Sequence, residues 1–298
     1  MSVKFKSDLI LILAAAIWGF AFVYQRIGME YLGPFSYNGV RFALGTLILL
    51  PVLWLRAKKK KPMLYNKHRS DRWKILIGTL VTGLLLFGGV SLQQLGLQTT
   101  TAGKAGFLTG LYVVLVPFVG MLFGQRSTFF MWIGAMLSLA GLYLLSITQG
   151  FYIDPGDKLV LLCALVFTFH VLFIGWLSPL MDSFLLAVIQ FAICALLSLI
   201  FAFTTETVTL NSIIQAWIPI AYGGILSVGI AYTLQVIAQK TAHPAYASII
   251  LSMEAVFAVL GGWLMLHELL TLRMLIGCGL MLVGMIVVQI RKVNGKVI

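Results

Sequence analysis

Charged residues are scarce in this sequence of 298 residues. Only 10% of the side chains belong to Asp, Glu, Lys or Arg, whereas 60% are hydrophobic, and the mean hydropathy is +1.01. A soluble domain of this length carries about a quarter charged residues, because its surface must be wetted. The shortage excludes an ordinary soluble protein and indicates an integral membrane protein.

Cysteine is also rare. Cys163, Cys194 and Cys278 all lie within apolar stretches. Their spacing fits no metal site, and an odd number cannot form a complete set of disulfides. We therefore expect free buried thiols, with no metal and no cofactor.

Motifs typical of ATP-driven transporters and of membrane proteases are missing as well. The sequence has no GxxxxGK[ST] loop for ATP, and HELL at 267–270 lacks the second histidine of a zinc-binding HExxH. No pair of aspartates lies within an apolar run. These absences argue against ATP-driven transport by this chain alone and against an intramembrane protease.

Apolar runs of bilayer-spanning length, about 20 residues, are abundant. Their continuous apolarity favours helices, since membrane β-strands alternate polar and apolar residues. The first run follows Lys4 and Lys6 as a signal peptide would, but it continues to Ile27, so we interpret it as a retained span. The sequence predicts an all-α membrane protein with ten transmembrane helices, at residues 8–27, 36–55, 74–97, 102–123, 128–147, 158–177, 183–203, 214–239, 244–265 and 271–290.

The formal net charge of +12 would suggest nucleic acid in a soluble protein. Here the basic residues crowd the ends of apolar runs, so we expect no nucleic-acid partner. About 16 of the 21 lysines and arginines fall on the side that holds both termini, which predicts a multi-pass plasma (inner) membrane protein with both termini in the cytoplasm. The run Lys58–Lys61 is typical of a topology anchor that contacts anionic lipid headgroups; a regulatory lipid site or docking site is the alternative.

Two segments of the chain match each other at a shift of 141 positions. GGVSLQQLGLQTT (88–100) aligns with GIAYTLQVIAQKT (229–241), so that Gln94 meets Gln235 and Thr100 meets Thr241. The match predicts two halves, residues 1–150 and 151–298, with five helices each. An odd number of spans turns the second half upside down, and such inverted repeats are typical of secondary transporters.

Four stretches resemble the EamA-type drug/metabolite transporters: AAAIWGFAFV (14–23), RF (41–42), TTAGKAGFLTGLYVVLVPF (100–118) and LSMEAVFAVLGGWLMLHE (251–268). The resemblance covers essentially the whole chain. It departs at Ala255, where the family's Leu-Glu-Pro triplet has proline, and at His267, where the family has glycine before Glu268. The missing proline argues against a kink in the ninth helix.

The resemblance implies an exporter or exchanger of small metabolites, such as amino acids, built from two five-helix EamA-like repeats. It also implies a central cavity surrounded by helices 1, 3, 4, 6, 8 and 9, with helices 5 and 10 to the side. Coupling of transport to protons would depend on the ionisable residues of this chain.

Glu254 lies about halfway along its apolar run, near the bilayer midplane, where ionisable residues face the bundle interior. It could couple protons, bind a cationic substrate group, or act as a structural acceptor paired with Arg41 or a helix end. Burial favours its neutral form. Arg41, about one turn into the second helix, could snorkel outwards, pair with an acid, or hold a substrate carboxylate. We favour a structural role for Arg41, because the second helix is not expected to line the cavity.

Other polar residues fall within the spans. Trp18 and Tyr112 either line the cavity or pack in the core, and His170 either contacts substrate in a proton relay or bonds between helices. Gln94 and Gln235 suit contacts at the two ends of the cavity, or interhelical hydrogen bonds. The expected substrate-binding set is Trp18, Tyr112, His170, Glu254, Gln94 and Gln235, with Glu254 and His170 as coupling candidates.

Glycine and proline mark packing positions. Gly106 and Gly110 form a GxxxG, and Gly134, Gly141, Gly277 and Gly284 form smooth stripes on helices 5 and 10. These favour close helix packing within the chain; a homodimer through helices 5 and 10 is the alternative. Pro117 predicts an interruption of the fourth helix about one turn earlier, near Val113.

The sequence thus predicts a secondary transporter working by alternating access. The main alternative is a polytopic scaffold or lipid-sensing protein, which would have a closed, dry core with a salt-bridged Glu254. A membrane enzyme is the third and weakest option.

Overall fold

Most of each predicted apolar run is helical in the computed structural model, which describes residues 3–59, 64, 69–100, 102–146, 154–266 and 269–290. About 85% of the described residues are helical, and these residues contain no strand. The elements in chain order are α1 (Val3–Gly28), α2 (Pro34–Lys58), α3 (Arg69–Gly96), α4 (Ala102–Gly110), α5 (Tyr112–Leu122), α6 (Phe129–Ser146), α7 (Pro155–Leu177), α8 (Ser183–Thr205), α9 (Leu210–Gln215), α10 (Trp217–Ala221), the π-helix η1 (Tyr222–Tyr232), α11 (Thr233–Gln239), α12 (Pro244–Leu251), α13 (Glu254–Leu266) and α14 (Leu272–Ile290).

The helices form a membrane protein. Eight are long and apolar enough to span a bilayer, while α6 and α14 contribute shorter apolar segments, Phe129–Leu144 and Leu272–Val288. Large apolar side chains are exposed around the bundle, as contact with lipid requires. Exposed tryptophans stand near helix ends, Trp54 and Trp73 at one end of the bundle and Trp217 and Trp263 at the other, where aromatic residues meet the membrane interface.

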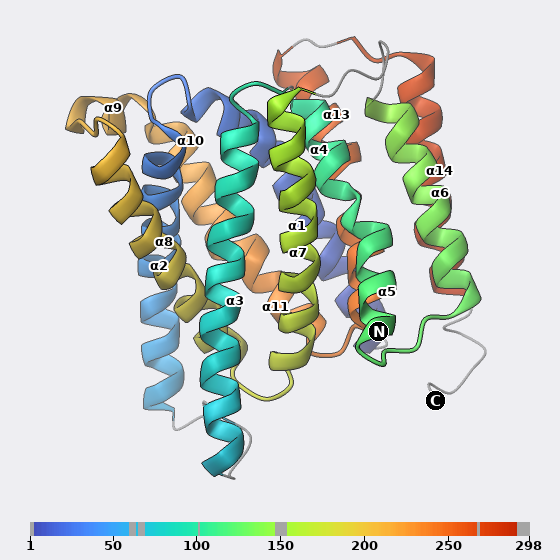
Figure 1. The fold of residues 1–298 in the computed structure, drawn as a ribbon, viewed down its shortest axis with the longest axis horizontal. Helices are drawn as coiled ribbons and strands as arrows, with labels where there is room; N and C mark the ends of the chain where they lie inside the picture. Colours follow the sequence, from blue (N-terminus) through green and yellow to red (C-terminus); the bar gives the residue numbers. More distant parts are fainter. Residues whose placement is uncertain are drawn as a thin grey trace.

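Helices α6 and α14 form a pair at one edge of the bundle (Figure 1), as the resemblance implies for helices 5 and 10. The two glycine stripes face each other within the chain. A β-carbon at Gly134 would lie 2.8 Å from the Gly284 carbonyl oxygen, and one at Gly141 would lie 2.5 Å from the Gly277 carbonyl oxygen. The stripes therefore serve intrachain packing, and a dimer at this edge would have to use the outer faces of both helices.

Helices α2 and α8 form a second pair, and polar contacts join them at both ends. At the end of α2, Arg56 forms an ion pair with Asp182, whose carboxylate also caps the start of α8. At the end of α8, Glu206 accepts hydrogen bonds from the backbone N–H groups of Phe35 and Ser36, each at 2.8 Å. These contacts fix α2 against α8 and satisfy the free N–H groups at the start of each helix.

Two spans are interrupted at mid-length. The fourth breaks at Leu111, between α4 and α5, and α5 continues through Pro117, so the interruption lies at the residue after Gly110. The ninth breaks at Ser252 and Met253 although its proline is missing. There the hydroxyls of Ser248 and Ser252 donate to the carbonyls three residues earlier, at 3.0 and 2.8 Å. Such local bonds compete with the helical ladder.

Candidate functional site

A cavity lies among the interrupted helices and their neighbours. Its lining consists of aromatic, amide, hydroxyl and charged side chains from both halves of the chain: Trp18, Phe22, Gln25, Arg41, Gln93, Thr109, Tyr112, Phe167, His170, Val171, Ser227, Tyr232, Gln235, Leu251 and Glu254. Apart from Arg41, these residues come from the six helices that the resemblance places around a central cavity. All the residues selected from the sequence lie here except Gln94.

Glu254 and Tyr112 meet across the cavity wall. The Tyr112 hydroxyl donates to Glu254 Oε1 at 3.1 Å. Each residue is the first of the half-helix that follows a break, Tyr112 in α5 and Glu254 in α13. Glu254 is only 5% exposed, and no Lys, Arg or His side chain within the described ranges forms an ion pair with it. Its place at a helix N-terminus offers partial positive charge instead.

Helix α1 approaches this site through Gly19. A β-carbon at Gly19 would lie 2.6 Å from the Glu254 carbonyl oxygen and 2.7 Å from the Ala258 nitrogen, so only glycine allows this crossing of α1 and α13. The preceding Trp18 donates from Nε1 to the Ser227 carbonyl at 3.3 Å, and its ring packs on Tyr232 at 4.5 Å between centroids. Both partners belong to η1, and π-helical turns are frequent at functional sites.

His170 occupies the other side of Tyr232. Its Nε2 lies 2.9 Å from Gln190 Oε1 on α8, and its ring stands edge-on to both Phe167 and Tyr232. The residue therefore bonds between helices and also lines the cavity. The two interpretations of His170 left open by the sequence are compatible in the structure.

Arg41 corrects the expectation that the second helix stays away from the cavity. Its side chain is only 1% exposed and lines the cavity, with Nε donating to Asn38 Oδ1 at 3.0 Å. The guanidinium lies 5.2 Å from the ring centroids of Tyr37 and Phe42. Room for it comes from η1, because a β-carbon at Gly223 would lie 3.2 Å from Arg41 Cδ.

Gln94 differs from its expected place. It is fully buried, and its Nε2 donates to the Gln25 backbone carbonyl at 3.4 Å instead of reaching the cavity. The neighbouring Gln93 lines the cavity and donates to Thr109 Oγ1 at 3.2 Å. Successive residues of a helix point about 100° apart, so only one glutamine of the QQ pair can face inwards. Of the two roles expected for Gln94, the structure shows the interhelical hydrogen bond, and Gln93 lines the cavity.

Several lining residues were missed from the sequence, notably Gln25, Gln93 and Tyr232. Gln25 and Gln235 each hold a buried side-chain oxygen without a hydrogen-bond partner in the described structure. Such orphan acceptors cost free energy unless water or a ligand satisfies them. The sequence signal that could have identified Gln93 is its position next to Gln94.

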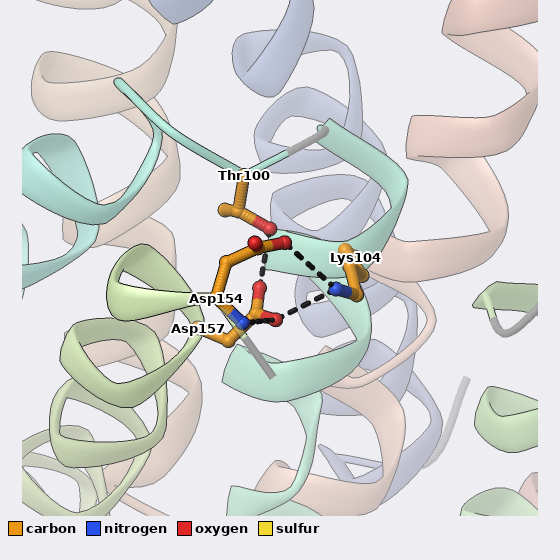
Figure 2. Close-up of polar contacts among 4 residues, drawn as sticks. All are labelled: Thr100, Lys104, Asp154 and Asp157. Carbon is orange, nitrogen blue, oxygen red and sulfur yellow. Dashed lines mark hydrogen bonds and ion pairs between the residues drawn. The ribbon is translucent and has the colours of Figure 1, made fainter. Parts of the chain in front are cut away.

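A polar cluster at one end of the bundle joins the start of α4 to the start of α7 (Figure 2). Lys104 Nζ lies 2.7 Å from Asp157 Oδ2 and 3.3 Å from Asp154 Oδ2, and Thr100 donates to Asp157 Oδ1 at 2.5 Å. At the opposite end, the hydroxyls of Ser7 and Thr241 lie 2.8 Å apart and join α1 to the α11–α12 connection. No sequence motif singles out the two aspartates.

Within the described ranges, no group of three His, Cys, Asp or Glu side chains could hold a metal ion. Cys163, Cys194 and Cys278 are free. His267, Glu268 and the second half of the Lys58–Lys61 run lie outside the described residues.

Comparison with known proteins confirms the resemblance. The EamA-like transporter family matches residues 5–147 and 154–290. A protein of Archaeoglobus fulgidus described as an uncharacterized transporter is 34% identical over 97% of this chain and 87% of its own length. The uncharacterized transporter YoaV of Bacillus subtilis is 24% identical over 90% of this chain and 91% of its own.

The inner membrane transporter YedA of Escherichia coli K12, also described as uncharacterized, is 26% identical over 49% of this chain and 45% of its own length. A solved crystal structure superposes with a TM-score of 0.79 at 18% identity, covering 98% of this chain and all of the other. That likeness supports the fold. The chain is a membrane transporter that belongs to the EamA-like transporter family.

Proposed function

We propose that this protein is a secondary transporter that moves small metabolites such as amino acids through the cavity by alternating access. The observation that carries the proposal is the cavity itself, which is lined by one buried acid and one buried base. Glu254 and Arg41 are not within ion-pair distance of each other or of any other described charge. A polar chamber of this kind suits a small polar substrate better than it suits a structural core.

Ten spans in two inverted halves, residues 1–150 and 151–298, are the architecture that we propose. Support comes from helix contacts that recur after a shift of five spans, with a broken helix counted as one. Helix α3 packs on α7 as α1 packs on η1 and α11, and α3 packs on α8 as α2 packs on η1. The pairs α2–α8 and α6–α14 are their own counterparts.

The ends of the bundle supply a mechanism for alternating access. Thr100 and Thr241, matched by the internal repeat, each bond the first turns of the opening helix of the other half, Thr100 through Asp157 and Thr241 through Ser7. The two contacts lie at opposite ends of the bundle. Opening one end while the other stays closed would expose the cavity to one side of the membrane at a time.

The interrupted helices are the proposed moving parts, with α5 and α13 turning about the breaks at Leu111 and Met253. Their link, the Tyr112–Glu254 hydrogen bond, places an ionisable group at that point. Glu254, with His170 also on the cavity wall, is the proposed site of proton coupling, because protonation of a buried carboxylate removes a costly charge. Export or exchange, as opposed to uptake, rests on the family resemblance.

The proposed location is the plasma membrane with both termini in the cytoplasm. The start of α1 and the end of α14 lie at the same end of the bundle as the end of α2 and the start of α3 (Figure 1). Arg56, Lys58 and Lys59 lie at that end, and basic residues mark the cytoplasmic face. Anionic headgroups are the lipid partners that this face would contact.

The scaffold alternative predicted a dry core with Glu254 in a salt bridge. The described structure has no such bridge, and Glu254 lines a cavity. The transporter interpretation is therefore preferred.

The test is transport by the purified protein in proteoliposomes, with an amino-acid and metabolite panel, with and without a pH gradient. We expect at least one compound to move, and Glu254→Gln to abolish the response to the gradient. Glu30→Gln is the matched control, because Glu30 is an exposed acid near the end of α1. A wild-type protein that moves no compound would contradict the proposal, and an unchanged response in Glu254→Gln would remove Glu254 from coupling.

A further inference from the structure

Arg41 is a buried cation with no counterion among the described residues. An arginine stays protonated at any physiological pH, and burying its charge without compensation is strongly unfavourable. Its exposure of 1% excludes snorkelling to the membrane surface. Two of the three roles expected from the sequence, snorkelling and pairing with an acid, are therefore not what the structure shows for the described residues.

The described acids that could have balanced this charge are engaged elsewhere or too far away. Glu206 binds the start of α2, Asp182 binds Arg56, and the aspartates of α7 bind Lys104. Glu254 lines the same cavity but lies beyond ion-pair distance, and its described bond is with Tyr112. Tyr232 lines the cavity together with Arg41 and Glu254.

Neighbouring side chains fix the position of the Arg41 guanidinium. Asn38 accepts from Nε at 3.0 Å, and its own amide is anchored by donation to the Val90 carbonyl at 3.2 Å. The rings of Tyr37 and Phe42 lie against the guanidinium. In the described structure the two terminal nitrogens make no hydrogen bond, although Arg41 lines the cavity. Two parallel N–H donors match the two oxygens of a carboxylate.

We infer that Arg41, positioned by Asn38, binds the carboxylate of the transported molecule, so that a carboxylate is required for recognition. The inference rests on the proposed function of the cavity and names the group that decides its specificity. A carboxylate fits better than a phosphate dianion, because Arg41 is the one Lys or Arg among the lining residues and the acid Glu254 shares the chamber. A substrate amine or hydroxyl would then face Glu254 and Tyr112.

Because Arg41 lies on α2, the proposed carboxylate subsite has a static position. Helix α2 is fastened to α8 at both ends, by Arg56 with Asp182 and by Glu206 with the start of α2. Glu254 and Tyr112 follow helix breaks instead. The carboxylate end of the substrate would thus stay on the static pair while the other end follows the movement of α5 and α13.

The experiment measures binding and transport separately, using matched triplets. One triplet is L-leucine, 3-methylbutylamine, which lacks the carboxylate, and 4-methylpentanoate, which lacks the amine; equivalent triplets are built on alanine and phenylalanine. Binding to the purified protein is read from the shift in its melting temperature and from tryptophan fluorescence, since Trp18 lines the cavity. In at least one triplet we expect the carboxylate-bearing compounds to bind and the amine to bind roughly tenfold to a hundredfold more weakly, the range for one hydrogen-bonded charge.

Two variants probe the residue itself. Arg41→Gln should bring the amino acid and the amine to equal affinity. Because this change could impair folding, N38D is the second variant: it places a carboxylate against Arg41 from within, at the cost of the donor to the Val90 carbonyl, and should remove the preference for carboxylates. Retention of the carboxylate preference in a folded Arg41→Gln or N38D protein would overturn the inference.

Other outcomes separate this inference from the proposed function. Equal binding of amine and carboxylate, or binding of neither, overturns the carboxylate subsite even if other metabolites are transported. Carboxylate-dependent binding without transport keeps the subsite and contradicts the transporter proposal. A chloride arm compares chloride with gluconate buffer; stabilisation by chloride to which no carboxylate adds would assign the subsite to an inorganic anion and overturn the inference.

Discussion

The Tyr112 hydroxyl donates a hydrogen bond of 3.1 Å to Glu254, and this bond joins the two interrupted spans of the bundle. The residues stand 142 positions apart, close to the shift of 141 positions at which two segments of the sequence match each other. Both follow a helix break, where backbone movement costs least. A rearrangement of α5 against α13 must therefore either carry this bond along or break it.

Tyr112→Phe should weaken both stability and transport. The change keeps the ring but removes the donor to Glu254, and an unsatisfied buried acceptor costs about 1–3 kcal/mol. We expect a lower melting temperature and a slower initial rate of transport for whichever panel compound the wild type moves. Tyr31→Phe is the control, because Tyr31 is exposed at 41%. Equal losses in both variants would show that the bond has no special role.

Gly19→Ala should destabilise the protein. The added methyl group would meet the backbone of α13 at Glu254 and Ala258, at 2.6 and 2.7 Å, and overpacking of this kind costs about 1–3 kcal/mol. Gly279→Ala is the matched change, since a β-carbon there meets no atom within 4 Å, and alanine is the better helix former by about 1 kcal/mol. Thermal unfolding in detergent should separate the two variants, with Gly279→Ala at or above wild type.

Lys104→Gln should open the end of the bundle at which Lys104 binds Asp154 and Asp157. The measurement is the labelling rate of a cysteine introduced at Thr109, on the cavity wall, in a protein whose native cysteines are replaced by alanine. A membrane-impermeant thiol reagent added at that end should react faster in Lys104→Gln.

Ser7→Ala, which removes the contact with Thr241 at the opposite end, should slow the same labelling, because the proposed alternating access couples the two ends. Unchanged labelling in Ser7→Ala would show that the two ends open independently.

His243 should make stability depend on pH. Its Nδ1 caps α12 by accepting from Ala245 N–H at 3.3 Å, and burial lowers the pKa of the ring. Because the folded pKa lies below the unfolded value of about 6.5, the unfolded chain binds more protons as the pH falls. Its contribution to stability is thus complete above about pH 6.5 and is lost as the pH falls below that value toward the lowered pKa.

His243→Asn keeps a capping side chain that does not titrate. We expect the melting temperature of the wild type to fall more steeply than that of the variant between about pH 6.5 and 5. Parallel curves for the two proteins would assign the pH dependence to other groups.

Much of the architecture followed from hydropathy. The apolar helices, the free cysteines and the close packing of the glycine stripes were predictable, because apolar length and small-residue spacing are properties of short segments. Five cavity residues could be selected from the sequence, because a polar group within an apolar run is expected to face the bundle interior instead of lipid. They are Glu254, Tyr112, Trp18, His170 and Gln235.

Other features could not be read from the chain. The choice of Gln93 over Gln94 depends on how α3 is rotated about its axis, which neighbouring helices decide. The entry of Arg41 into the cavity depends on the absence of a side chain at Gly223, 182 positions away. The break before Glu254 arises from serine hydroxyls bonding to their own helix, where the family has a proline signal.

By itself, the sequence determined that this protein is a helical membrane protein of a transporter family, since both conclusions rest on composition and local motifs. The tertiary structure alone decided that an acid and an arginine, selected separately, share one chamber without neutralising each other. The local sequence determines the length and polarity of each helix. The distance between two charges depends instead on how the helices that carry them pack in the bundle.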